Sequence, residues 1–151
     1  MDYISFEDFH DFQVIDELFT SLGEPEGLYL IRCLLGDHAT GRFGEDFGGR
    51  ILLLKEINQD LVPLLRLWDG DKLFVINCPH LNDSAIDMMG SELQKIHVFN
   101  CPDVSFMALR RFVQSRLHLS STRYPEVQTL TICGNVPPLS EQDRAWFAAN
   151  V

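Results

Sequence analysis

The sequence predicts an α/β solenoid, a short curved stack of about five parallel strands with helices on the convex side and a helical cap at each end. Three observations predict it. Two stretches of the chain repeat each other without gaps, a shorter aliphatic pattern recurs around them, and the intervening segments show helical periodicity. A length of 151 residues suits a single domain.

The strongest repeat contains the sequence Asn-Cys-Pro. Residues 73–86 (LFVINCPHLNDSAI) align with residues 96–109 (IHVFNCPDVSFMAL) at an offset of 23 positions. In both copies an aliphatic residue follows the cysteine by three positions, and an alanine and an aliphatic residue lie near the end. Matches in phase at several positions indicate one structural unit used twice.

Weaker copies follow the pattern aliphatic-x-aliphatic-x-x-Cys. Residues 28–33 fit it fully, residues 130–135 carry Asn instead of Cys, and residues 52–57 fit only its first half. The second aliphatic positions are spaced by 24, 21, 23 and 34 residues, at Leu30, Leu54, Val75, Val98 and Ile132. The last spacing predicts an insertion of about ten residues, which we place at 116–126 because that stretch is polar.

Strand geometry explains the pattern. Alternate side chains of a strand point to opposite faces, so the two aliphatic residues of each unit point inward together. A single unit cannot bury them, and successive units therefore stack as a parallel sheet. Cys33, Cys78 and Cys101 follow the strands, where their side chains can satisfy turn backbone groups that would each cost about 1–3 kcal/mol if left unpaired. Cys133 is expected to face outward.

In the segments between the predicted strands, apolar residues recur at helical spacing. Residues 83–93 and 105–117 are predicted as helices, and residues 60–68 as a short helix beginning near Pro63. The two ends are predicted as caps within one domain: residues 1–24 at the N-terminus, repeats over 25–136, and residues 137–151 at the C-terminus.

Both cap predictions start from capping-box patterns. Ser5 to Asp8 would open a helix reaching about Leu22, and Ser140 to Asp143 would open the closing helix. Apolar residues form one stripe of the first helix, at Phe9, Phe12, Ile15, Phe19 and Leu22. The closing helix would carry Trp146 and Phe147.

From Leu73 to Val151 the chain resembles the cysteine-containing leucine-rich repeats of F-box proteins, and residues 130–147 are similar to the ends of many fungal members. The resemblance implies a short leucine-rich-repeat solenoid. It also implies substrate recognition for a ubiquitin ligase. No segment matches an F-box, since the first twenty residues lack its Leu-Pro opening.

Composition narrows the classes of partner. The formal net charge of −10 disfavours nucleic acid and anionic membrane surfaces as partners. No apolar run approaches the roughly 20 residues of a membrane span, and the acidic start is unlike a secretory signal. Four cysteines without C-x-x-C spacing predict free thiols in a reducing compartment, the cytoplasm or the nucleus.

Candidate chemistry is sparse. The cysteines form a row, not a tetrahedral cluster, so we expect no metal and no cofactor. The glycine-rich segment 36–49 lacks the spacing of a phosphate-binding loop and is interpreted as a connection. Cys133 has no evident histidine partner for nucleophilic catalysis. We therefore expect a protein that is not an enzyme, with a small thiol-dependent enzyme as the remote alternative.

The outward positions carry the functional prediction, a protein partner bound on the concave sheet. Many of these positions are apolar, although water-facing strand positions are usually polar, and contiguous apolar patches mark interaction sites. Lysines in the adjacent row would add charge selectivity. The predicted contact residues are Tyr29, Ile31, Leu53, Phe74, Ile76, His97, Phe99, Lys72 and Lys95. Self-association, or cover by another part of the same polypeptide, would also explain the apolar face.

Overall fold

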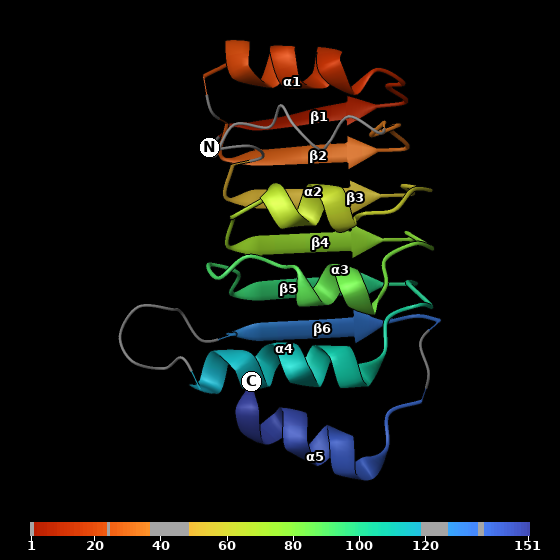
Figure 1. The fold of residues 1–151 in the computed structure, drawn as a ribbon, viewed down its shortest axis with the longest axis vertical. Coiled ribbons are helices and arrows are strands. Elements are labelled where there is room, and N and C mark those ends of the chain that lie inside the picture. Colours follow the sequence, from red (N-terminus) through yellow and green to blue (C-terminus); the bar gives the residue numbers. More distant parts are fainter. Residues whose placement is uncertain (1, 24, 37–48, 119–126, 136–137) are drawn as a thin grey trace.

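The computed structural model describes residues 2–23, 25–36, 49–118, 127–135 and 138–151, which form an α/β structure with one open, all-parallel sheet (Figure 1). The six described strands lie in sequence order, β1-β2-β3-β4-β5-β6. Their bounds are Tyr3–Glu7, Gly27–Ile31, Ile51–Lys55, Lys72–Ile76, Lys95–Phe99 and Thr129–Cys133. The helices α1 to α5 span Phe12–Ser21, Val62–Leu67, Asp83–Asp87, Phe106–His118 and Glu141–Asn150.

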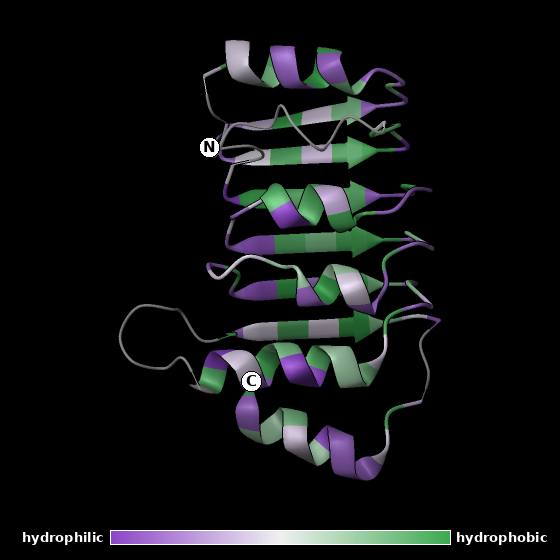
Figure 2. Ribbon diagram, viewed as in Figure 1, coloured by the Kyte–Doolittle hydropathy of each residue, from purple (hydrophilic) through white to green (hydrophobic). Residues whose placement is uncertain are grey.

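The strands pair in the register that the aliphatic pattern predicts. Leu30 lies opposite Leu54, then Val75, Val98 and Ile132 follow in line across the sheet. These side chains and those two positions before them form the covered face, which points toward the helices. From β2 to β5 its residues are at most 1% exposed, at Leu28, Leu30, Leu52, Leu54, Leu73, Val75, Ile96 and Val98. Figure 2 shows the corresponding hydrophobic bands crossing neighbouring strands.

A row of left-handed residues ends the strands at the carboxyl edge of the sheet. The residue after each strand has positive φ in all six described units, at Asp8, Arg32, Glu56, Asn77, Asn100 and Gly134. In the first five units its backbone N–H donates to the last carbonyl of the next strand, over 2.9–3.0 Å. This backbone geometry gives every unit the same sharp exit from its strand, whatever side chain stands there.

The buried cysteines lie one position beyond that row. The thiol of Cys78 donates to the Leu54 carbonyl at 3.6 Å, and that of Cys101 donates to the Val75 carbonyl at 3.8 Å. Cys33 reaches back to the Phe6 carbonyl at 3.3 Å in the same way. Each thiol also lies 3.4–3.5 Å from the last carbonyl of its own strand, at the turn where the sequence predicted such a contact. The contact with the preceding strand was not predicted.

The helices vary in length from unit to unit. In Figure 1, α2 and α3 cross the same face of the sheet, and α3 packs beside α4. Helix α2 begins beside Pro63, as predicted, and α4 ends within a residue of the predicted end. Helix α3 ends at Asp87 and is therefore shorter than the predicted 83–93. Its start is capped by Asn82, whose side-chain carbonyl accepts a hydrogen bond from the Ala85 N–H at 3.0 Å.

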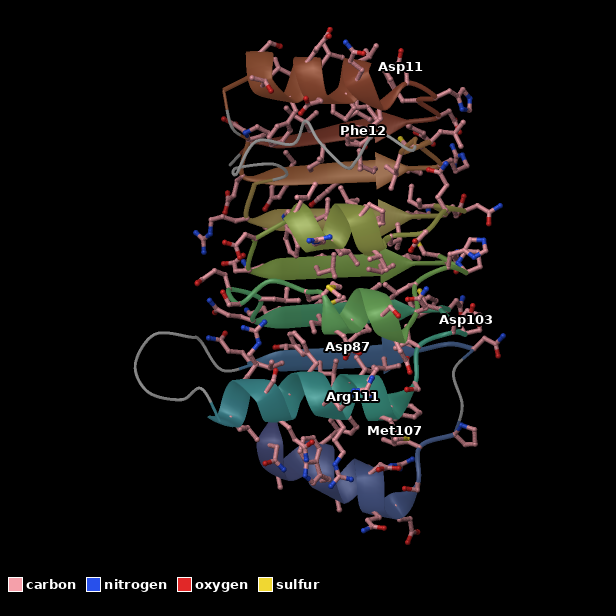
Figure 3. The ribbon with its side chains drawn as sticks, viewed as in Figure 1. Asp11, Phe12, Asp87, Asp103, Met107 and Arg111 are labelled. Atoms are coloured by element: carbon pink, nitrogen blue, oxygen red, sulfur yellow. The ribbon has the colours of Figure 1, made fainter. Side chains whose placement is uncertain are left out.

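The N-terminal prediction of a helical cap opening at Ser5 is wrong. Ser5 lies within β1, which pairs in parallel with β2, so the sheet has six described strands instead of about five. The helix begins only at Phe12, where the Asp11 carboxylate accepts a hydrogen bond from the Gln13 N–H at 3.0 Å (Figure 3). Of the predicted stripe, Phe12, Ile15 and Phe19 are buried, Phe9 is partly buried and Leu22 is exposed.

The C-terminal cap prediction is confirmed at its opening. The hydroxyl of Ser140 accepts the Asp143 N–H at 3.1 Å, and α5 starts at the next residue. Trp146 and Phe147 pack edge to face against each other, only partly buried. Most of the predicted insertion at 116–126 and of the glycine-rich connection at 36–49 lies outside the described residues.

Candidate protein-interaction face

The second face of the sheet carries three in-register rows of outward side chains, which we call the open face. The first row runs along the amino ends of the strands, at Tyr3, Gly27, Ile51, Lys72, Lys95 and Thr129. The middle row is Ser5, Tyr29, Leu53, Phe74, His97 and Thr131. The last row is Glu7, Ile31, Lys55, Ile76, Phe99 and Cys133.

All nine predicted contact residues lie on this face and reach solvent. Phe99 is 45% exposed. The other eight are partly exposed, at Tyr29, Ile31, Leu53, Lys72, Phe74, Ile76, Lys95 and His97. The apolar members sit on neighbouring strands from β2 to β5, so they form one patch instead of scattered side chains. A contiguous apolar patch of this kind is typical of a surface that binds another molecule.

Two pairs of rings on neighbouring strands pack against each other on the open face. Phe74 and His97 stack with their planes 4° apart and their centroids 4.5 Å apart. Tyr3 and Tyr29 lie 5.4 Å apart at a tilt of 35°. Partial burial, and then the charge of Lys95, lower the pKa of His97 below its usual value. The lowered pKa favours the uncharged imidazole at neutral pH, whose flat ring lies stacked on Phe74.

Sequence reasoning missed two contributors to this face. Strand β1 adds Tyr3, Ser5 and Glu7. A signal for it exists, since Ile4, Phe6 and Phe9 match the positions of Leu28, Leu30 and Cys33 at an offset of 24, with aromatic residues at two positions. Lys55, opposite Ile76 in the last row, is not among the nine predicted contact residues.

Arginine 32 forms a charged cluster at the carboxyl edge beside the open face. Its guanidinium donates to Asp8 Oδ1 at 2.7 Å, to the carboxylate of Glu7, and to Glu56 Oε2 at 3.4 Å. The hydrogen bonds from Arg32 lower the pKa of Asp8. Glu7 and Asp8 belong to the unit of β1, Glu56 follows β3, and Arg32 itself follows β2, so the cluster ties these three neighbouring units together where the strands end.

The cysteines separate into two environments. Cys33, Cys78 and Cys101 are buried, and burial raises the pKa of each thiol, that of Cys78 to about 12. Such thiols are poor nucleophiles at neutral pH. Cys133 is exposed on the last row of the open face. Among the described residues no group of three or more His, Cys, Asp or Glu side chains could hold a metal ion.

A hollow lies at the C-terminal end, between β6, α4 and α5. Its volume is about 540 Å³. Leu130 and Ile132 line it and are only partly buried, whereas the residues at the equivalent positions of β2 to β5 are fully buried. Arg144 is the one charged side chain among the described lining residues. The hollow reflects the loose packing of α5, which buries none of its described residues.

Comparison with known proteins adds no relative. No family model matches the chain, and neither does any curated protein or any solved structure. In the described part of the chain, no helix combines the length and the apolar character needed to cross a membrane.

Proposed function

We propose that this chain is a leucine-rich-repeat solenoid that binds a protein partner on its open face. The single observation that carries the proposal is the contrast between the two faces of one sheet. The strands of the covered face are closed by helices, while the same strands hold a patch of partly exposed apolar and aromatic side chains on the other side.

The repeat assignment is supported by the recurrence of one backbone unit. The six described strands lie in sequence order, and the left-handed residue after each one recurs at intervals of 21 to 34 residues. In three of the units a cysteine thiol also donates to the preceding strand. Among the described strands, each one pairs with the strands next to it in the sequence, which is the arrangement of a repeat protein.

The binding assignment is supported by the composition of the patch. Aromatic anchors dominate the energetics of protein interfaces, and Phe74, His97 and Phe99 are adjacent on β4 and β5. Stacking fixes the rings of Phe74 and His97 before a partner arrives, which reduces the side-chain entropy lost on binding.

The test compares partner capture by the wild-type protein with capture by the Phe74→Ala, Phe99→Ala double variant. Met107→Ala is the matched control, since Met107 is a 72% exposed apolar residue on α4, away from the open face (Figure 3). We expect the double variant to lose the specifically captured protein, and the control to retain it, with both variants folded by circular dichroism. Equal capture by all three proteins would show that the partner does not bind at Phe74 and Phe99.

Self-association is the second candidate, because the same apolar patch could pair with that of a second copy. Light scattering across a wide concentration range separates the two: a mass that stays monomeric excludes self-association, and a dimer abolished by Phe74→Ala with Phe99→Ala establishes it. The role in ubiquitin ligation implied by the resemblance stays a prediction, tested by capture of a ligase adaptor with the full gene product.

A further inference from the structure

The chain contains three lysines, Lys55, Lys72 and Lys95, and all three lie on the open face. They come from the consecutive strands β3, β4 and β5. The molecule as a whole is acidic, with 22 Asp and Glu against 12 Lys and Arg. The placement of every lysine on one face of an acidic protein therefore marks that face as electrostatically distinct.

The lysines lack carboxylate partners within the described structure. Every ion pair among the described residues uses arginine, and none uses Lys55, Lys72 or Lys95. Glu7, at the end of β1, is the one carboxylate among the described open-face residues, and it forms an ion pair with Arg32, which follows β2. The half of the face over β3, β4 and β5 thus carries positive charge without a described counter-charge.

Lys72 and Lys95 lie directly opposite each other on β4 and β5. Neighbouring strands are about 4.8 Å apart, and like charges at opposite positions destabilise a sheet. A carboxylate placed between the two ammonium groups would reverse that repulsion. The arrangement is unfavourable in the isolated molecule and favourable in a complex with an acidic ligand.

The apolar anchors lie between the charged positions. Along β4, Lys72 is followed on the same face by Phe74 and Ile76, and Lys55 ends the same face on β3. At about 3.3 Å per residue, Lys55 lies roughly 13 Å further along the strand direction than Lys72 and Lys95. In an extended segment, two acidic residues about four positions apart would therefore reach Lys55 at one end and Lys72 and Lys95 at the other, with the apolar residues between them over the apolar anchors.

From this placement we infer that the partner presents an acidic segment whose carboxylates flank aromatic or aliphatic residues. The inference rests on the proposed function and names the chemistry of its ligand. The central row of Leu53, Phe74 and His97 requires apolar contact as well as charge, which distinguishes such a segment from a purely anionic polymer.

The test selects a random peptide library displayed on phage against the full chain, then measures the affinity of the selected peptides. We expect enrichment of Asp and Glu around apolar residues, binding that weakens as salt rises, and at least a roughly tenfold loss with Lys72→Glu, Lys95→Glu. The control is Arg66→Glu, Arg144→Glu, which changes the net charge equally at exposed sites outside the face and should leave affinity unchanged.

Each outcome separates the two proposals. Peptides that depend on Phe74 but carry no excess of acid, and bind the lysine variant equally, overturn this inference and leave the proposed function standing. A selection that yields no Phe74-dependent binder overturns both. A single-stranded oligonucleotide that competes as well as the acidic peptides also overturns this inference, because phosphate would then suffice.

Discussion

The two faces of the sheet are built from alternate residues of the same strands, yet they differ in what encloses them. Leu73 points toward the helices and is fully buried, whereas Phe74, the next residue, points outward and reaches solvent. The neighbours of Leu73 on that side are equally buried, while those of Phe74 are a lysine, a histidine and aliphatic side chains. Stability should therefore depend on one face and recognition on the other, with little overlap.

The largest expected effect breaks the covered face. Leu73→Ala should lower the free energy of unfolding by about 3 kcal/mol, because it removes a fully buried side chain and leaves a cavity. Phe74→Ala should cost less than about 1.5 kcal/mol, since its ring is partly in water. Urea unfolding of the two variants measures the difference, and equal losses would show that the faces are not distinct.

The next effect concerns the carboxyl edge, where the faces meet. Gly134→Ala should cost about 2–3 kcal/mol, because φ is +85° and an added Cβ would lie 1.8 Å from Asn100 Oδ1, which accepts a hydrogen bond from the Asn135 N–H. Gly23→Ala is the control, with φ of +76° but no atom within 4 Å. It should cost only about 1 kcal/mol. Thermal unfolding that ranks them equally would contradict the described edge.

A smaller and opposite effect is expected at Glu56, which holds the left-handed conformation with φ of +55°. Asn77 and Asn100 occupy the equivalent positions of the next two units, and asparagine tolerates this conformation better than glutamate. Glu56→Asn should raise the free energy of unfolding by about 0.5–1 kcal/mol. Its exposed contact with Arg32, at 3.4 Å, contributes little and does not offset the gain. A loss of stability would mean that the charged cluster outweighs the backbone strain.

The smallest effect sharpens the description of the open face. His97 should titrate below the usual 6.5 by NMR. Phe74→Ala should raise its pKa by admitting water, and Lys95→Gln should raise it less. Because the folded pKa is lowered, this group's contribution to stability is full above pH 6.5 and is lost as the pH falls through the folded pKa. An unchanged pKa in Phe74→Ala would show that the ring does not shield the imidazole.

The sequence predicted the central and C-terminal elements well because their signals are local. The two Asn-Cys-Pro copies located β4 and β5, and Ser140 located the start of α5. The first strand was missed because its pattern uses Phe6 where the other units have an aliphatic residue, and Phe9 where three of them have a cysteine. Ser5 and Asp8 match the spacing of a capping box, but in the structure Asp8 is the left-handed residue that follows β1.

The candidate site shows a similar division. The register placed all nine contact residues on one face, since side-chain alternation is exact within a strand. The row of left-handed residues could not be predicted as a row, because Arg32 and Glu56 have no preference for this conformation, unlike the Asp, Asn and Gly residues at the other positions. What they share is a backbone conformation imposed by the stacked units, which no single residue type reports.

The most direct test asks whether β4 and β5 lie side by side in the described register. In a Cys133→Ser background, Lys72→Cys with Lys95→Cys should form an intramolecular disulfide under mild oxidation, since the residues are directly opposite and about 4.8 Å apart at Cα. Lys72→Cys with Phe99→Cys should remain reduced, because those positions are roughly 13 Å apart along the strands. Efficient closure of the second pair, or none of the first, would contradict the stacking on which the open face depends.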